Sequence, residues 1–140
     1  MIKVFLDSSV LFSAVFSDKG YARDLFELAE WGDIELVISE YVLEEVRRNL
    51  KNKASGVLDL LEVFIESIPI KVVKNTNKKL VLQVAKYTHI KDAPVVASAL
   101  EQKVDYLASF DRKDLVENNQ VKKGSRLKIV MPKKVVLLFD

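Results

Sequence analysis

The stretch KVFLDSSVLF, Lys3–Phe12, decides the fold class of this chain. An apolar run of strand length, 2–6, ends at Asp7, and a second apolar run with helical spacing follows at once. A carboxylate is rarely placed where a core strand stops unless a charged group lies opposite it. Asp7 is therefore either the N-cap of the next helix or part of a site at a strand end.

Beyond Asp7, strand-length apolar runs alternate with segments of helical periodicity, which is typical of α/β proteins. Strands are expected over 2–6, 35–38, 71–73, 105–109 and 127–131, with a further edge strand over 135–139. Helices are expected over 9–16, 20–31, 39–53, 57–67, 77–87 and 93–103, with Gly32 ending the second and Ser39 capping the third. This order predicts a three-layer α/β/α sandwich with a central, mainly parallel sheet.

Length and composition narrow the class of protein. The 140 residues contain no linker-like tract, so one domain over 1–140 is expected. The chain has no cysteine, which excludes disulfides and thiolate metal sites. No signal-peptide pattern and no apolar run of membrane-spanning length is present, so a cytoplasmic protein without a membrane partner is expected. The formal net charge of +2 does not by itself indicate a nucleic-acid binder.

Basic residues gather in two places, over 121–140 and on the helix after Ser39, where Arg47, Arg48, Lys51 and Lys53 lie. Such clusters either hold phosphates or form an ordinary solvated face.

The position of an acid on its element separates surface residues from site candidates. On the helix after Ser39, the apolar positions form one stripe: Val42, Leu43, Val46 and Leu50. At about 100° per residue, Glu44 falls nearly opposite this stripe, whereas Glu45 falls near its edge. Glu44 is therefore expected in solvent, and Glu45 either turns toward a cleft or is a flank residue with a polar neighbour.

Three further acids follow strand ends or begin helices. Asp92 precedes a helix, so it suits an N-cap; if helical geometry extends back to it, its carboxylate projects onto the apolar face, and the two roles can coexist. In DYLASFDRKDL, Asp105–Leu115, a strand ends in Ser109, and Asp111 and Asp114 follow. Acids in a first helical turn complement the helix dipole. Two strand ends and two helix starts that all carry acids are harder to explain by capping alone.

Carboxylates that converge in a cleft repel one another and bind cations. Mg²⁺ and Mn²⁺ prefer oxygen ligands and keep waters and substrate phosphates in their coordination shells. Acids without cysteine or paired histidines therefore favour metal-assisted phosphodiester chemistry. The single histidine, His89, excludes a His-rich zinc site, and no glycine motif cradles a phosphate.

Four segments carry a resemblance to a known family: FLDSSVL, VISEYVLEEV, KDAPVVASAL and DYLASFDRKDL, in this order and together spanning most of the chain. The chain resembles the PIN-domain family, particularly the stand-alone members that include VapC-type toxins. The resemblance implies a PIN-like fold and identifies its four acids as Asp7, Glu45, Asp92 and Asp111. It makes Asp114 a supplementary acid, places Ser109 at a Thr/Ser position within the site, and places Ser9 where many members carry Asn.

The resemblance also implies an activity. The four acids would hold one or two Mg²⁺ or Mn²⁺ ions, with Glu45 as ligand or water-orienting group, and RNA phosphodiester bonds would be hydrolysed to leave a 5′-phosphate. Implied partners are the RNA substrate, an antitoxin protein and a second copy of the chain. The alternatives are a non-catalytic or housekeeping PIN module that binds RNA or protein, and a relative of the flap endonucleases.

Overall fold

The central sheet has five strands in the order β3-β2-β1-β4-β5, and every neighbouring pair is parallel. The structure, a computed structural model, describes residues 1–53 and 55–140. The strands are β1 Ile2–Leu6, β2 Ile34–Ser39, β3 Ile70–Val73, β4 Tyr106–Ala108 and β5 Ile129–Val130. The predicted parallel sheet is therefore confirmed.

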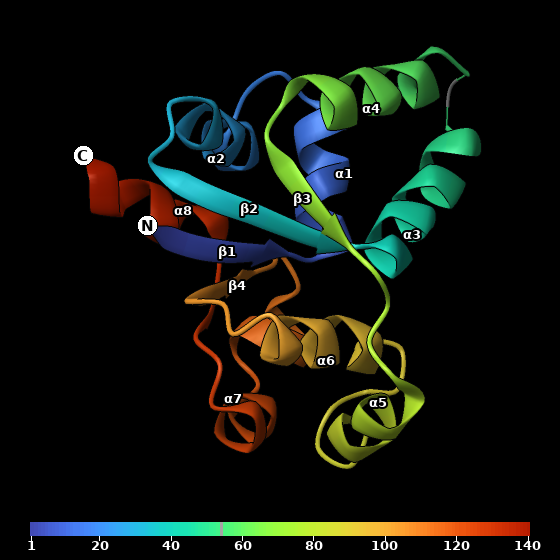
Figure 1. Ribbon diagram of the computed structural model, residues 1–140, viewed down its shortest axis with the longest axis vertical. Helices are drawn as coiled ribbons and strands as arrows, with labels where there is room; N and C mark the ends of the chain where they lie inside the picture. The colour runs from blue at the N-terminus through green and yellow to red at the C-terminus, as the bar shows by residue number, and fades with distance from the viewer. Residues whose placement is uncertain (54) are drawn as a thin grey trace.

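Helices cover both faces of this sheet (Figure 1). On one side lie α1 Ser8–Phe16, α2 Tyr21–Glu30, α3 Glu40–Lys51 and α4 Ser55–Ser67. On the other lie α5 Lys78–Val84, α6 Ala93–Glu101 and α7 Asn119–Ser125. This is the predicted three-layer α/β/α arrangement. In the described part of the chain, no helix is long and apolar enough to cross a membrane.

The three central strands are buried on both faces, as their continuous apolar runs require. Their fully buried side chains include Val4, Phe5, Leu6, Leu36, Val37, Ile38, Leu107 and Ala108. The polar residues begin where these runs stop: Asp7 follows β1, Ser39 ends β2, and Ser109 follows β4. The rigid core thus fixes the starting point of each polar side chain at one edge of the sheet.

The strand order creates a switch point beside Asp7. From β1 the chain proceeds to β2 and β3 on one side, and it later returns to β4 and β5 on the other side. Leu6 pairs with Ala108 across this point, and the Asp7 N–H donates to the Ala108 carbonyl at 3.0 Å. Ligands of open α/β sheets bind in the crevice beyond the carboxyl ends of the strands at such a point.

Two expected helix ends are confirmed. The Ser39 hydroxyl accepts the Val42 N–H at 3.3 Å and caps α3. After α2, Gly32 adopts a φ of 83°, and the Asp33 N–H donates to the Leu28 carbonyl at 2.9 Å, which closes a Schellman motif. The cap fixes the start of the helix that carries Glu45.

The edge strand expected over Val135–Phe139 is wrong. This segment belongs to a helix, α8 Pro132–Val136, followed by a 3₁₀ turn, η2 Leu137–Phe139. Pro132 stands in the first turn, where it favours a helix start, and the buried residues Pro132 and Val135 lie three positions apart, as on one helix face. Contacts with α2 override the strand preference of two adjacent valines.

No element was expected between the fourth and fifth strands, yet the structure has two there. A π-helical turn, η1 Arg112–Val116, follows β4, and α7 precedes β5. Asn118 caps α7 by accepting the Val121 N–H at 3.2 Å. These two elements hold Asp111 and Asp114 in a tight turn beside the switch point.

Candidate functional site

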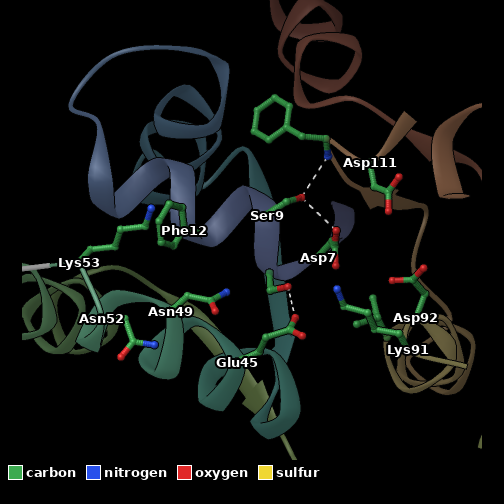
Figure 2. Close-up of a pocket in the computed structure, with 13 residues that line it drawn as sticks. Asp7, Ser9, Phe12, Glu45, Asn49, Asn52, Lys53, Lys91, Asp92 and Asp111 are labelled. Atoms are coloured by element: carbon green, nitrogen blue, oxygen red, sulfur yellow. Dashed lines mark hydrogen bonds between the residues drawn. The ribbon is translucent and has the colours of Figure 1, made fainter. Parts of the chain in front are cut away.

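A pocket of about 560 Å³ opens at the carboxyl edge of the sheet. Its lining comes from α1, α3, the start of α6 and the turn after β4 (Figure 2). The structure brings together in it the four acids identified from the sequence: Asp7, Glu45, Asp92 and Asp111. Helices and strands far apart in the sequence thus present their carboxylates to one volume.

Asp7 is a buried carboxylate held by two hydroxyl groups. It is only 7% exposed, and its Oδ2 atom accepts hydrogen bonds from the Ser9 hydroxyl at 2.9 Å and the Ser109 hydroxyl at 2.8 Å. Burial raises the pKa of Asp7, the two hydroxyls oppose this rise, and the Glu45 charge adds slightly to it. Asp7 stands at the N-cap position of α1, but its side chain makes no capping bond. Capping therefore does not explain this buried charge.

Ser9 and Ser109 also tie Asp7 to the turn after β4. The Ser9 hydroxyl accepts the Phe110 N–H at 3.1 Å, and the Ser109 hydroxyl accepts the Asp111 N–H at 2.9 Å. Each hydroxyl therefore bridges Asp7 and the backbone of this turn, with Ser109 fully buried behind the pocket. The two serines fix the position of Asp7 relative to Asp111.

Asp92 is half-buried and its side chain does not cap α6. Its backbone is already helical, with φ −93° and ψ −11°, so helical geometry does extend back to this residue. Burial raises the pKa of Asp92 to about 6, and the negative charges of Asp7, Asp111 and Asp114 contribute to the rise. The pocket therefore holds this carboxylate at an electrostatic cost.

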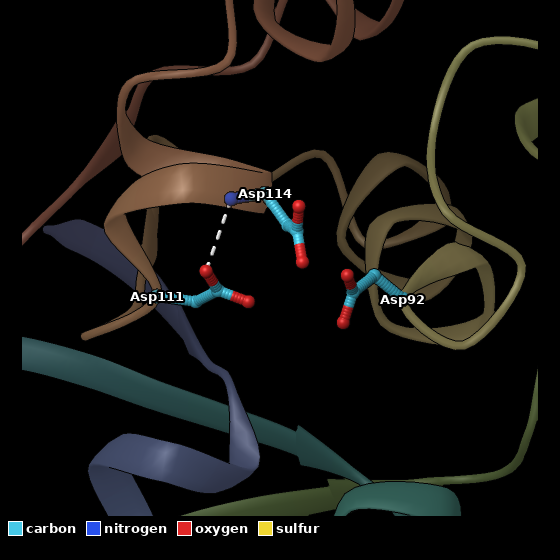
Figure 3. A group of neighbouring side chains, drawn as sticks. All are labelled: Asp92, Asp111 and Asp114. Atoms are coloured by element: carbon cyan, nitrogen blue, oxygen red, sulfur yellow. Dashed lines mark hydrogen bonds between the residues drawn. The ribbon is translucent and has the colours of Figure 1, made fainter.

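Asp111 and Asp114 share one turn, in which Asp111 Oδ1 accepts the Asp114 N–H at 3.0 Å. Asp92, Asp111 and Asp114 each present one carboxylate oxygen, and these atoms all lie within 4.8 Å of one another (Figure 3). Asp114, expected only as a supplementary acid, thus belongs to the tightest group of acids among the described residues. An oxygen-only group of this size suits a hard divalent cation.

Glu45 and its neighbour Glu44 point in different directions, as the helical spacing predicts. Glu45 lines the pocket, where its carboxylate accepts a hydrogen bond from the Ser8 hydroxyl. Glu44 is exposed and forms an ion pair with Arg47 at 2.7 Å. Ser8 was not identified from the sequence, because a serine in the first turn of a helix gives no sign of its partner.

Other lining residues were also missed, namely Phe12, Asn49, Asn52 and Lys91, whereas Lys53 belongs to the basic cluster noted from the sequence. Asn49 and Asn52 are four and seven positions after Glu45, so their place on the same helix face could have been found from spacing. Lys91 precedes Asp92 directly, but sequence does not reveal that its side chain borders the pocket. Lys91 beside Asp92 and Lys53 at the opposite end of the pocket add positive charge to its lining (Figure 2).

A family model described as "PIN domain" matches residues 3–113. The chain belongs to the PIN-domain family. The match contains the first three segments on which the sequence resemblance was based and all but the last two residues of the fourth, and it includes Asp7, Glu45, Asp92 and Asp111. No curated protein sequence matches the chain significantly.

Solved structures resemble this PIN domain in fold. PAE2754 from Pyrobaculum aerophilum has a TM-score of 0.68 at 14% identity, covering 98% of this chain and 94% of that one. VapBC2 from Rickettsia felis, solved with a DNA fragment from its promoter, has a TM-score of 0.68 at 12% identity, with 91% and 97% coverage.

VapC20 of Mycobacterium tuberculosis, a toxin that cleaves the sarcin–ricin loop, has a TM-score of 0.54 at 17% identity, with 79% and 91% coverage. At these identities the likeness shows a shared fold.

Proposed function

We propose that this PIN domain is a metal-dependent ribonuclease that hydrolyses RNA phosphodiester bonds at the acidic pocket. One observation carries the proposal: Asp7, Glu45, Asp92 and Asp111 line one pocket, and neither Asp7 nor Asp92 caps its helix. Buried or crowded carboxylates without a structural role are typical of sites that hold cations. Because all four acids are present, a non-catalytic module is the less favoured reading.

The donor set fits Mg²⁺ or Mn²⁺. Asp92, Asp111 and Asp114 offer three carboxylate oxygens within 4.8 Å of one another, and Asp7 lies in the adjoining pocket. No cysteine and only one histidine occur in the chain, so softer donors do not compete. A bound divalent ion would supply a water of lowered pKa and would neutralise charge on the phosphate.

The residues of the chain have separate tasks in this proposal. Asp7 is fixed at the site by the Ser9 and Ser109 hydroxyls, which oppose the rise in its pKa that burial causes. Glu45, held by Ser8, either accepts a proton from the attacking water or orients that water. Lys53 and Lys91 border the pocket and would hold the phosphates of the RNA on either side of the cut.

The biological setting is also a proposal. VapBC2 and FitAB, which resemble this chain in fold, were solved with promoter DNA and with IR36 DNA respectively. We assign this chain to the toxin side of such a toxin–antitoxin pair, with an antitoxin protein and a second copy of the chain as partners. We also assign residues 1–140 to one nuclease domain, since β5 extends the sheet and α8 packs on α2.

The test uses the purified chain, free of partners, with total cellular RNA and Mn²⁺. We expect fragments with 5′-phosphate ends, which sequencing of the new ends would map, and no fragments with the Asp7→Asn variant or in EDTA. Equal fragment yields from wild type and Asp7→Asn would overturn the assignment.

A further inference from the structure

The pocket has a second wall that carries no acid. Asn49 on α3 and Asn52, directly after its last residue, face the same volume as Phe12 on α1, and all three lie away from Asp92 and Asp111 (Figure 2). Lys53 closes this end of the pocket. The acids therefore occupy one part of the pocket, and uncharged amides and an aromatic ring occupy the rest.

The two asparagines have no structural task in the described residues. Asn75, Asn77 and Asn118 each accept a backbone N–H, at 2.7, 2.9 and 3.2 Å, and so help to position the helices that follow or neighbour them. Within the described parts of the chain, the side chains of Asn49 and Asn52 make no hydrogen bond. Asparagine is also a poor helix former, yet Asn49 lies inside α3. Two exposed amides thus line the pocket without a hydrogen-bond partner among the residues that the structure describes.

Phe12 offers a flat apolar face to the same space. Its ring stacks on Phe16, one turn along α1, at 5.5 Å between centroids and 9° between planes. Phe12 is half-buried, whereas Phe16 is 55% exposed. Aromatic side chains at the edge of a nucleic-acid site are the usual platform on which unpaired bases stack.

We infer that Asn49, Asn52 and Phe12 form a recognition subsite for an unpaired RNA base next to the scissile phosphate. The inference rests on the proposed function, and it names the part of the substrate that this wall contacts. Along the α3 axis, Asn49 lies about 6 Å and Asn52 about 10 Å beyond Glu45. A nucleotide that places its phosphate beside the acids thereby brings its base to the amides.

The chemistry of this wall favours a base over a phosphate or a peptide. A carboxamide offers donors and an acceptor in one plane, which matches the edge of a base but adds no charge for a phosphate. The cationic contact is left to Lys53 at the end of the wall. Base edges are accessible in this way only in single-stranded or looped RNA, since the deep groove of an RNA helix hides them.

The first experiment separates the base from the backbone. In the non-cleaving Asp7→Asn background with Mg²⁺, fluorescence anisotropy measures the binding of a single-stranded hexaribonucleotide and of an abasic oligomer of equal length. We expect Asn49→Ala combined with Asn52→Ala, and Phe12→Leu alone, to weaken hexamer binding about ten-fold. Binding of the abasic oligomer stays unchanged, and Asn119→Ala, an exposed asparagine outside the pocket, leaves both unchanged. An equal loss for both oligomers, or no loss for either, would overturn the subsite.

The second experiment tests whether the same residues determine which bases are preferred during cleavage. With Asp7 intact, a random RNA pool is cut and the bases around each cut are counted. We expect the wild type to prefer particular bases beside the cut and the Asn49→Ala, Asn52→Ala variant to cut with that preference relaxed. Unaltered preference in the variant contradicts the subsite while leaving the nuclease intact. A wild type that cuts no RNA contradicts the proposed function, and the anisotropy measurement then still decides the subsite.

Discussion

The two sides of the acidic pocket hold their carboxylates in opposite ways. On one side, Asp7 is buried and its Oδ2 accepts two serine hydroxyls, and Glu45 accepts a third from Ser8. On the other side, Asp92 faces Asp111 and Asp114, and no hydrogen bond from a described residue reaches its carboxylate. Hydrogen bonds hold the carboxylates of the first side, whereas on the second side the repulsion between neighbouring acids raises the pKa of Asp92.

The carboxylates of the two sides are therefore stabilised by different partners. Hydrogen bonds from the protein offset the energetic cost of burying the Asp7 carboxylate. The position of Asp7 is therefore set before any ligand binds. No hydrogen bond from a described residue offsets the repulsion around Asp92, whose pKa His89 lowers only in part, and a divalent cation would relieve this repulsion. Substitutions on the first side should therefore affect catalysis through the charge or the position of preorganised groups, whereas those on the second should affect stability and metal binding together.

The largest effect is expected from Asp7→Asn. The amide has the shape of the carboxylate and its oxygen still accepts the Ser9 and Ser109 hydroxyls, so folding is preserved, but the charge is lost. We expect RNA cleavage to fall by more than about 100-fold, since changes at partners of metal ligands alone cost 10- to 100-fold. Initial rates on a fluorescent RNA and circular dichroism measure the two properties. Full activity in a folded variant would remove Asp7 from the site.

Metal binding tests the other side. If Asp92, Asp111 and Asp114 hold Mg²⁺ or Mn²⁺, a concentration of 100 Kd raises the free energy of unfolding by about 2.7 kcal/mol. Thermal denaturation with and without Mn²⁺ should show this rise in the wild type and a much smaller rise in Asp92→Asn. Asp33→Asn, which alters an exposed acid outside the pocket, serves as the control. An equal rise in all three proteins would place the metal elsewhere.

Glu45 and Glu44 form a matched pair on one helix. Glu45→Gln removes a charge from the pocket, and Glu44→Gln removes one from the surface ion pair with Arg47. We expect the first change to reduce cleavage about 10- to 100-fold. The second should leave cleavage unchanged, since exposed ion pairs contribute little. Similar rates for the two variants would show that the helix face of Glu45 has no part in catalysis.

Ser109→Ala tests geometry without altering any charge. The variant loses one of the two hydroxyls on Asp7 and the acceptor of the Asp111 N–H. We expect the pKa of Asp7 to rise further and cleavage to fall about ten-fold, because a hydrogen bond to a charged group contributes about 1.5–3 kcal/mol. A shift of the pH–rate profile to higher pH would separate this role from simple loss of packing, and an unshifted profile would contradict it.

The sequence was sufficient for the five parallel strands and for the placement of Asp7 and Glu45 at the pocket, whereas their role in a site stays a prediction. Buried parallel strands are continuous apolar runs, and a carboxylate immediately after such a run, as at Asp7, is visible without coordinates. Helical spacing likewise separated Glu45 from Glu44 because α3 is regular and capped by Ser39. Both are local properties of the chain.

The remaining features depend on contacts between distant segments. Two valines favour a strand at Val135 and Val136, and only packing on α2, with Pro132 at the start, makes α8 a helix. The bond from Ser8 to Glu45 and the place of Lys91 beside the pocket depend on how α1, α3 and α6 meet. The choice between cap and site for Asp92 was open from sequence, since both use the same position in the chain.

The smallest expected effect is the dependence of the free energy of unfolding on pH that Asp92 causes. Its pKa is raised to about 6 in the folded state, from an ordinary value of 3.8. Between these two values the folded protein binds more protons than the unfolded chain, so without metal the free energy of unfolding falls as pH increases from 4 to 6. Solvent screening of a half-exposed group limits the fall to about 1 kcal/mol.

Urea denaturation at several pH values, in EDTA, measures this effect as the difference between wild type and Asp92→Asn. The variant lacks the titrating group. Its free energy of unfolding should therefore increase relative to that of the wild type as pH increases from 4 to 6, and the difference should stay constant above pH 6. Because Asp7 also has a raised pKa, part of the fall should remain in the variant. A difference independent of pH would mean that the repulsion around Asp92 is already relieved without a cation, and the contrast between the two sides would then disappear.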